Sequence, residues 1–247
     1  MTRNIALTLR YDGTRYHGWQ IQKNVISVCG TVQDALSQIC GHEVSLMGCG
    51  RTDAGVHAER YTANFRTSST IPAERLPFAL NSNLPDDIAA LDARDVEYDF
   101  HSVFSCVRKE YTYRLYHSAH RDPLLAARSL HYPKKPQLEA WRNAAENFLG
   151  THDFAAVRSM NRNPTIKNTI RTVYAFDVYE EFENHFAFRI AASGFLYNMA
   201  RAMVGTVLYA GLGKIESVPE LLASLNRTAA GPTLPPYGLY MTNAEYP

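Results

Sequence analysis

The sequence predicts an α+β protein with two similar α+β halves that share a mixed, mostly antiparallel sheet. Segments in which polar and apolar residues alternate, as in half-buried strands, are interspersed with segments of helical spacing. The order strand, helix, strands, helix, strand occurs twice along the chain. The 247 residues are enough for two modest halves with a core each. We place the halves at residues 1–105 and 106–247.

The first half contains four expected strands and two expected helices. Residues 5–11 alternate and end in the turn residues Asp12 and Gly13, and Thr31 is the expected N-cap of a helix that runs to Cys40. The other expected elements are strands at 44–47, 58–65 and 88–96 and a helix at 72–80, which begins with a proline.

The second half repeats this mixture. Strands are expected at 111–116, 169–179 and 185–191, and helices at 195–210, 218–225 and 137–149, the last of which ends at Gly150. Between residues 190 and 213 the only charged residue is Arg201, so a membrane span has to be considered. Because a central arginine costs roughly 2.5–3.5 kcal/mol in an inserted helix, we interpret the segment as a buried helix of a soluble protein.

The composition is that of an ordinary folded protein, with 46% hydrophobic residues, 20% charged residues and a formal net charge of +1. This balance excludes an indiscriminate nucleic-acid binder, so an RNA partner would be held by clustered basic residues. Two such groups are present, Arg158, Arg162, Lys167 and Arg171, and Arg108, Lys109, Arg114 and Arg121. The four cysteines form no CxxC pair, which favours reduced thiols in the cytoplasm over a zinc site or a disulfide framework. No spacing typical of metal ligands is shown by His57, His117, His120 and His152, and we assign them no role.

The strongest candidate for chemistry is the segment 49–58, CGRTDAGVHA. Gly50 and Gly55 permit tight turns and the close approach of a ligand. Arg51 and Asp53 project from the same face of an extended backbone and could pair, which would keep the carboxylate ionised. An ionised aspartate can act as a nucleophile or a general base, but it can equally cap a turn, and the spacing leaves both readings open.

This segment resembles the central motif of TruA-type tRNA pseudouridine synthases, in which its aspartate is catalytic. Other segments resemble motifs of that family in the same order along nearly the whole chain. They are YDGTRYHGWQIQ at 11–22, TVQ at 31–33, NSNLPDDI at 81–88, KEYTY at 109–113, FLYNMAR at 195–201 and GLY at 238–240. Two positions depart from the family pattern, because Val103 and Glu110 stand where basic residues are usual, which weakens the expected attraction for phosphate.

The resemblance implies a pseudouridine synthase fold with a central active-site cleft, and a reaction that uses no cofactor and no metal. It implies that Asp53 is the essential catalytic residue and that Arg51, Tyr111 and Arg201 bind the substrate, with Tyr111 lining the uridine pocket. The implied substrate is uridine at positions 38 to 40 of the tRNA anticodon stem-loop. The implied assembly is a homodimer in the cytoplasm.

Arg201 has support that does not depend on the resemblance. It is the only charge in an apolar helix, and a buried charge is costly unless it is paired. Asp53 is the natural partner, and an Arg201 that snorkels at the helix edge is the alternative.

Two other functions stay open at this stage. A non-catalytic RNA-binding or RNA-folding module on the same fold would need the basic groups but not Asp53. A metal-independent glycoside hydrolase would need a second carboxylate, which no comparable motif supplies.

Overall fold

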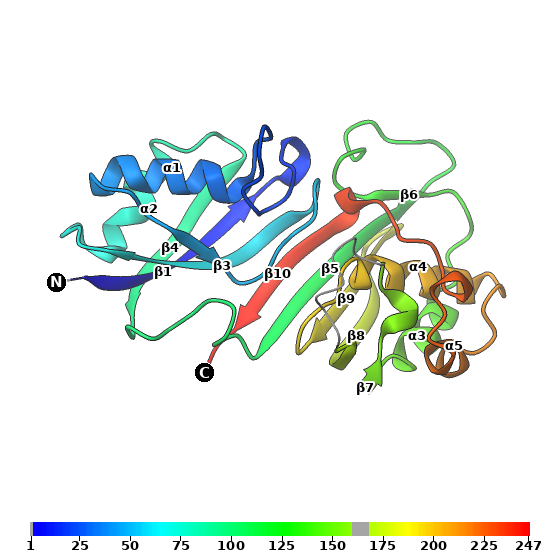
Figure 1. The fold of residues 1–247 in the computed structure, drawn as a ribbon. Helices are drawn as coiled ribbons and strands as arrows, with labels where there is room; N and C mark the ends of the chain where they lie inside the picture. Colours follow the sequence, from blue (N-terminus) through cyan, green and yellow to red (C-terminus); the bar gives the residue numbers. More distant parts are fainter. Residues whose placement is uncertain (1, 160–167) are drawn as a thin grey trace. The chain divides into compact units, whose positions relative to one another are not determined.

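The computed structural model describes residues 2–159 and 168–247 (Figure 1). Contacts divide this chain into two compact units. The first unit is Met1–Val107 together with Tyr240–Pro247, and the second unit is Arg108–Leu239. In the described parts of the chain, no helix is long and apolar enough to cross a membrane.

The sheet of the first unit has the strand order β4-β1-β3-β10, with the short β2 beside β3. β1 is antiparallel to β3 and to β4, and β2 is antiparallel to β3, whereas β10 runs parallel to β3. The strands are β1 (Arg3–Tyr11), β2 (Leu46–Gly48), β3 (His57–Thr67), β4 (Ile88–Val96) and β10 (Leu239–Glu245).

The core of the first unit lies between one face of this sheet and two helices, α1 (Val28–Cys40) and α2 (Leu76–Asn81) (Figure 1). Alternate side chains of β1 and β3 point to this face, as expected for a strand with one buried side. Across the antiparallel pair, Ile5 lies opposite Phe65, Leu7 opposite Ala63 and Leu9 opposite Tyr61, and all six are buried.

The helix α1 begins earlier than the sequence predicted, so the assignment of Thr31 as its N-cap was wrong. Ser27 is the N-cap, with extended backbone angles and a hydroxyl oxygen that accepts from the Gly30 amide at 3.2 Å. Thr31 lies in the first turn, where its hydroxyl donates to the Ser27 carbonyl at 3.1 Å. Serine and threonine both suit a cap, and only the backbone angles decide between them. The helix ends at Gly41, whose φ of 73° is left-handed.

The sheet of the second unit has the strand order β5-β9-β8-β7, with β6 beside β5. Neighbouring strands are antiparallel except β5 and β6, which are parallel. The strands are β5 (Arg108–His117), β6 (Leu130–Tyr132), β7 (Gly150–Asp153), β8 (Ile170–Phe182) and β9 (His185–Ala192).

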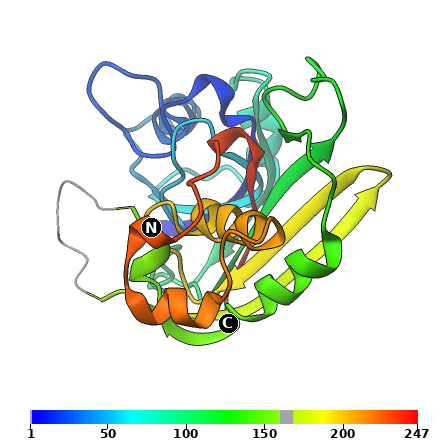
Figure 2. The ribbon, with the colours of Figure 1, turned by 90° about the vertical axis from the view of Figure 1, so that its right-hand side faces the viewer.

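Figure 2 looks onto the helices of the second unit, α3 (Leu138–Glu146), α4 (Met199–Gly211) and α5 (Val218–Ser224). Trp141 of α3 is fully buried, with its ring centroid 5.6 Å from that of Phe186 and 5.5 Å from that of Phe188. A side chain at Gly211 of α4 would lie 2.5 Å from the Trp141 Nε1 atom. The two helices are therefore packed closely enough to require glycine at this contact.

The α+β class and the mixed, mostly antiparallel pairing of the strands are confirmed. The sequence missed β6 and β7, which are only three and four residues long. Two further helix boundaries were wrong. Gly150 begins β7 with a φ of 98° instead of ending α3, and α4 begins at Met199 after Asn198, whose φ is 61°. The helix expected at 72–80 is divided into a 3₁₀ turn, Ala73–Arg75, and α2.

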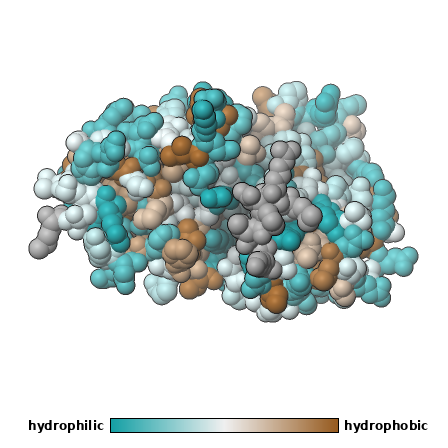
Figure 3. Space-filling model, viewed as in Figure 1, coloured by the Kyte–Doolittle hydropathy of each residue, from teal (hydrophilic) through white to brown (hydrophobic). Residues whose placement is uncertain are grey.

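Among the described residues, large exposed apolar side chains occur in both units, and a few of them, such as Val103 and Phe104, are neighbours in the chain. The two most exposed are Leu124 at 86% and Phe104 at 84%, and they belong to different units. On the face shown in Figure 3, hydrophilic residues predominate and the apolar groups are small and scattered. The face in this view therefore shows no broad apolar area of the kind that marks a docking surface.

Candidate active site

Asp53 lies in the loop that connects β2 to β3, and both ends of this loop are fixed by hydrogen bonds. At its start, the Cys49 amide donates to the Thr62 carbonyl at 2.9 Å. At its end, the Val56 amide donates to the Asp53 carbonyl at 3.1 Å, which closes a tight turn in which Gly55 has a φ of 78°. Asp53 thus begins a tight turn and is half-buried there.

The glycines of the opening segment 11–22 let its backbone lie directly on this loop. A Cβ atom at Gly13 would be 2.0 Å from the Val56 carbonyl oxygen, and one at Gly18 would be 2.3 Å from that of Thr52. Two backbone hydrogen bonds join the same segments, from the Trp19 amide to the Thr52 carbonyl at 3.1 Å and from the Gly55 amide to the Tyr16 carbonyl at 3.3 Å. Only glycine allows such an approach of two backbones.

Three aromatic side chains brace the loop from inside the first unit. Trp19 stacks on Tyr61 with ring centroids 4.1 Å apart, and Tyr11 lies against both rings. The Tyr11 hydroxyl shares a buried 2.9 Å hydrogen bond with the Thr52 hydroxyl, and the Tyr61 hydroxyl donates to the Gly50 carbonyl. The residue next to Asp53 is therefore fixed by side chain as well as by backbone. Tyr11 and Trp19 stand in the opening motif, but their spacing did not predict that they form a cluster with Tyr61.

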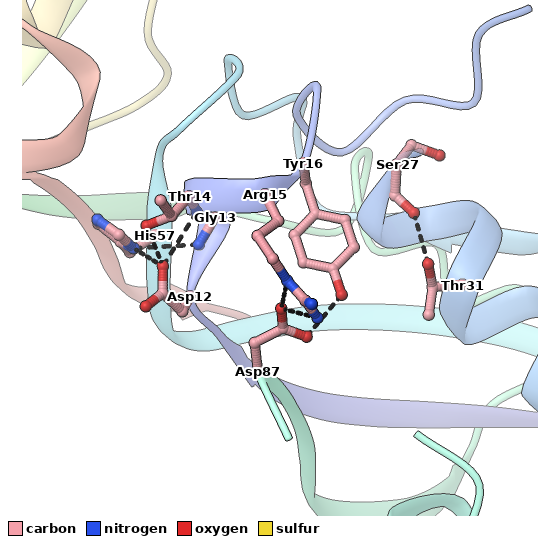
Figure 4. A network of polar contacts seen from close by, with 9 residues as sticks. All are labelled: Asp12, Gly13, Thr14, Arg15, Tyr16, Ser27, Thr31, His57 and Asp87. Carbon is pink, nitrogen blue, oxygen red and sulfur yellow. Dashed lines mark hydrogen bonds and ion pairs between the residues drawn. The ribbon is translucent and has the colours of Figure 1, made fainter. Parts of the chain in front are cut away.

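A polar network connects the end of β1 to the start of β3 (Figure 4). His57 is 2% exposed, and its Nδ1 atom lies 3.0 Å from the Gly13 amide nitrogen and 3.1 Å from Asp12 Oδ1. The same oxygen of Asp12 accepts from the Thr14 amide at 3.0 Å, which caps the short 3₁₀ helix Gly13–Arg15. The sequence gives no sign of this role for His57, because its contacts come from segments that lie far from it in the chain.

A second part of the network fixes the opening segment to the start of β4. Asp87 accepts from Arg15 Nε and from the Tyr16 hydroxyl, both at 2.6 Å (Figure 4). Burial, followed by the hydrogen bond to Asp87, raises the pKa of Tyr16 to about 12, so this phenol stays protonated and a donor. The opening segment is therefore attached to two strands and to the loop of Asp53.

The four residues predicted to form the site belong to two units. Asp53 and Arg51 lie in the first unit, and Tyr111 and Arg201 lie in the second. Arg51 is exposed, and among the residues that the structure describes it has no hydrogen-bond or ion-pair partner, so the suggested pair with Asp53 is not formed there. Pairing of Asp53 with Arg201 stays a prediction.

Within the second unit, the guanidinium of Arg201 is held near the start of α4. Its Nη1 atom donates to the Leu234 carbonyl at 3.0 Å, and its Nη2 atom donates to Asn198 Oδ1. The orientation of the cation is thus set by groups that precede and follow it in the chain. Sequence periodicity did not predict these two acceptors, because Leu234 lies in an irregular segment.

Tyr111 is 7% exposed on β5, and Phe195 meets its ring edge-on with centroids 4.9 Å apart. Its neighbour Glu110 points to the opposite face of the sheet, because successive side chains alternate along a strand. There Glu110 lies 3.9 Å from Arg189, which also pairs with Asp177 at 2.8 Å. The acidic residue at position 110 is therefore not on the face of Tyr111. Val103, the other departure, is 38% exposed in the first unit.

Of the basic residues expected to hold RNA, some lie outside the described residues and others interact within the protein. Arg162 and Lys167 lie outside the described residues. Arg114 pairs with Glu181 at 3.1 Å, and Arg171 donates to the Ile170 carbonyl at 2.6 Å while burial lowers its pKa. Both guanidinium groups therefore already interact with groups of the protein itself. Among the described residues, no group of histidine, cysteine and acidic side chains could hold a metal ion.

A family model described as tRNA pseudouridine synthase matches residues 8–105 and 144–247 of this chain. The chain belongs to the tRNA pseudouridine synthase family. The matched ranges include the loop of Asp53 and the helix of Arg201, whereas Tyr111 lies between them. As a member of this family the protein is an isomerase that acts on uridine in RNA, which sets aside the RNA-folding module and the glycoside hydrolase.

Curated relatives of this pseudouridine synthase match it over its whole length. It is 45% identical over 246 residues to a protein of Thermoanaerobacter sp. (strain X514) named tRNA pseudouridine synthase A, with 99% of this chain and 100% of the relative covered. Relatives with the same name and coverage come from Caldicellulosiruptor bescii, at 45% identity, and Ruminiclostridium cellulolyticum, at 40%.

Proposed function

We propose that this enzyme converts uridine to pseudouridine at positions 38 to 40 of the tRNA anticodon stem-loop, with Asp53 as the essential catalytic residue and without a cofactor. The observation that supports Asp53 is the way its loop is held. The turn at 53–56, the two close glycine contacts and the Tyr11–Thr52 hydrogen bond fix the backbone on both sides of this carboxylate. A catalytic side chain whose backbone is fixed before the substrate binds needs less reorganisation during the reaction.

The reaction is an isomerisation whose atoms balance within the substrate. The bond between N1 of uracil and C1′ of the ribose breaks, the uracil turns, and a bond from C5 to C1′ forms. C5 then loses its proton, and N1 ends with one. Asp53 can start this sequence either by attacking C1′ or by removing a ribose proton, and both roles suit an ionised carboxylate.

Tyr111 is the proposed platform for the target base. The base must leave its stack before a carboxylate can reach the sugar, which costs a few kcal/mol. Stacking one base on an aromatic ring contributes roughly 1–3 kcal/mol and would offset part of this cost. The edge-on contact with Phe195 restrains the Tyr111 ring, so little of that gain would be lost in ordering it.

Arg201 is the proposed counter-charge of Asp53, and Arg51 is a proposed contact for the RNA backbone. The two acceptors of Arg201 set the direction of its guanidinium, which favours a specific ion pair over a freely moving cation. Arg51 is exposed two residues from Asp53, where a guanidinium can contact a phosphate of the bound strand. We also propose that the enzyme works as a homodimer in the cytoplasm, as the family resemblance implies.

Tritium release from tRNA that carries 5-tritiated uridine tests the catalytic role. Asp53→Asn keeps the shape of the side chain and removes its charge, so release should cease while tRNA binding survives. Asp34→Asn is a matched control, because Asp34 is exposed on α1. An Asp53→Asn enzyme that keeps even a few per cent of turnover would contradict the assignment. Substrates with single uridines at position 38, 39 or 40 test the site of modification.

A further inference from the structure

The buried side chain of His57 is close to the proposed catalytic loop but has no part in the chemistry described above. It stands four residues after Asp53 at the first position of β3. Its ring stacks on Tyr240 of β10, with centroids 4.7 Å apart and an interplanar angle of 23°. The stack fixes the plane of the imidazole, and this plane directs Nδ1 toward Gly13 and Asp12 (Figure 4).

The two groups near Nδ1 require different states of this nitrogen. The Gly13 amide carries a hydrogen and points it at Nδ1, 3.0 Å away, so Nδ1 accepts with its lone pair. An ion pair with Asp12 Oδ1 at 3.1 Å would instead require a proton on Nδ1. Nδ1 cannot be unprotonated for Gly13 and protonated for Asp12 at the same time. The geometry of the amide favours a neutral ring with its proton on Nε2, and Asp12 is meanwhile occupied by Thr14, which donates its amide at 3.0 Å.

The hydrogen bond to Gly13 affects the loop because Gly13 lies against Val56. There is no space for even a methyl group between Gly13 and the Val56 carbonyl oxygen. Val56 in turn donates its amide to the Asp53 carbonyl at 3.1 Å and closes the turn that carries the carboxylate. A shift of Gly13 would therefore be transmitted to Val56 and from there to Asp53, through backbone atoms alone.

We propose that His57 is a positioning residue for the catalytic loop. The lone pair of its Nδ1 holds the Gly13 amide, and Gly13 in turn fixes the turn at Asp53–Val56. This inference rests on the proposed role of Asp53, but it concerns a different atom and predicts a different pattern of effects. His57 itself makes no contact with the reacting uridine in this role.

Two substitutions separate the hydrogen bond from the packing of the ring. His57→Asn places an amide oxygen where Nδ1 stood, so it keeps the acceptor and loses the stack on Tyr240. His57→Phe keeps a ring on Tyr240 and loses the acceptor. If the acceptor positions the loop, His57→Phe should lower kcat by at least about tenfold with little change in KM for tRNA, and His57→Asn should stay within about threefold of the natural enzyme.

The results expected from a merely structural histidine are the reverse. If the ring only fills space, His57→Phe should be active, and kcat losses should follow losses of thermal stability in both variants, which would overturn the proposal. An active His57→Phe beside an inactive Asp53→Asn would remove this inference and leave the proposed function standing. An active Asp53→Asn would remove the proposed function itself.

A measurement on the unmodified enzyme covers the case in which a variant does not fold. Nitrogen NMR of the histidine rings reports which nitrogen carries the proton. We expect Nδ1 of His57 to show the shift of an unprotonated nitrogen that accepts a hydrogen bond, and the Gly13 amide to exchange slowly with solvent. A protonated Nδ1 together with a rapidly exchanging Gly13 amide would overturn the proposal.

Discussion

Replacing Gly18 with alanine should displace the loop that carries Asp53. Gly18 has a φ of 84°, which alanine adopts at a cost of about 1–2 kcal/mol. The added methyl group would also lie 2.3 Å from the Thr52 carbonyl oxygen and 3.1 Å from the Asp53 carbonyl carbon, whereas ordinary contact begins at 3.4 Å. Both obstacles are backbone atoms, so no side chain can rotate away to make room.

The size of the displacement follows from these distances. The difference between 3.4 Å and 2.3 Å means that Gly18 and Thr52 must separate by about 1 Å. A reacting group misplaced by about 1 Å can slow a reaction by about 10²-fold, which is about 2.7 kcal/mol of barrier. We therefore expect Gly18→Ala to lose about 1–2 kcal/mol of stability from its φ alone, and to lose up to two orders of magnitude in kcat.

The assay compares Gly18→Ala with Gly41→Ala. Gly41 also has a left-handed φ, 73°, but a Cβ atom there would meet nothing within 4 Å. Both variants are compared by urea unfolding and by tritium release from 5-tritiated tRNA. Gly41→Ala should lose stability and keep its turnover, and Gly18→Ala should lose both. A Gly18→Ala enzyme within threefold of the natural kcat would refute the reasoning that close packing positions Asp53.

Three further substitutions or reactions test separate parts of the molecule. Tyr111→Ala should weaken the productive tRNA complex far more than Tyr111→Phe, measured as kcat/KM, and equal, negligible effects would assign Tyr111 to the core alone. Arg201→Met should lower tritium release by at least about tenfold while circular dichroism stays unchanged, because it removes the proposed counter-charge of Asp53; an unchanged rate would exclude that pairing. Burial raises the pKa of Cys29 to about 11, so about one thiol in 10³ is ionised at pH 8, and mass spectrometry should find slow alkylation of Cys29 by iodoacetamide in the folded enzyme. Rapid alkylation at pH 8 would contradict this burial.

The parts of the fold that the sequence predicted are those whose side chains alternate over many residues. β4 was expected at 88–96 and is found at Ile88–Val96, where buried residues alternate at Ile88 and Ala90 before a register shift moves the next buried residue to Ala93. The short strands β6 and β7 have too few residues to show such a period. Helix ends were also missed, since Ser27 and Thr31 are chemically equivalent caps and only backbone angles distinguish them.

The candidate site was predicted from a motif, and the reasons for its geometry were not. Residues 49–58 and 11–22 were each identified as matching segments, but nothing in their spacing indicated that one lies on the other. The contacts that join them are hydrogen bonds between backbone atoms, such as that from the Trp19 amide to the Thr52 carbonyl, and backbone groups are the same in every residue. Their only trace in the sequence is glycine, at Gly13 and Gly18, where a Cβ atom would not fit.

Glu110 shows how the structure changes the meaning of a sequence difference. On the sequence alone, an acid beside Tyr111 weakens the attraction of the uridine pocket for phosphate. In the structure, Glu110 occupies the other face of β5 and lies close to Arg189, which also binds Asp177. Its charge is therefore partly balanced on a face that Tyr111 does not share, and the strand can carry an acid at this position without placing it against a bound base. The difference at position 110 thus concerns the ion pairs of that face, whereas Val103 is exposed at the surface of the first unit.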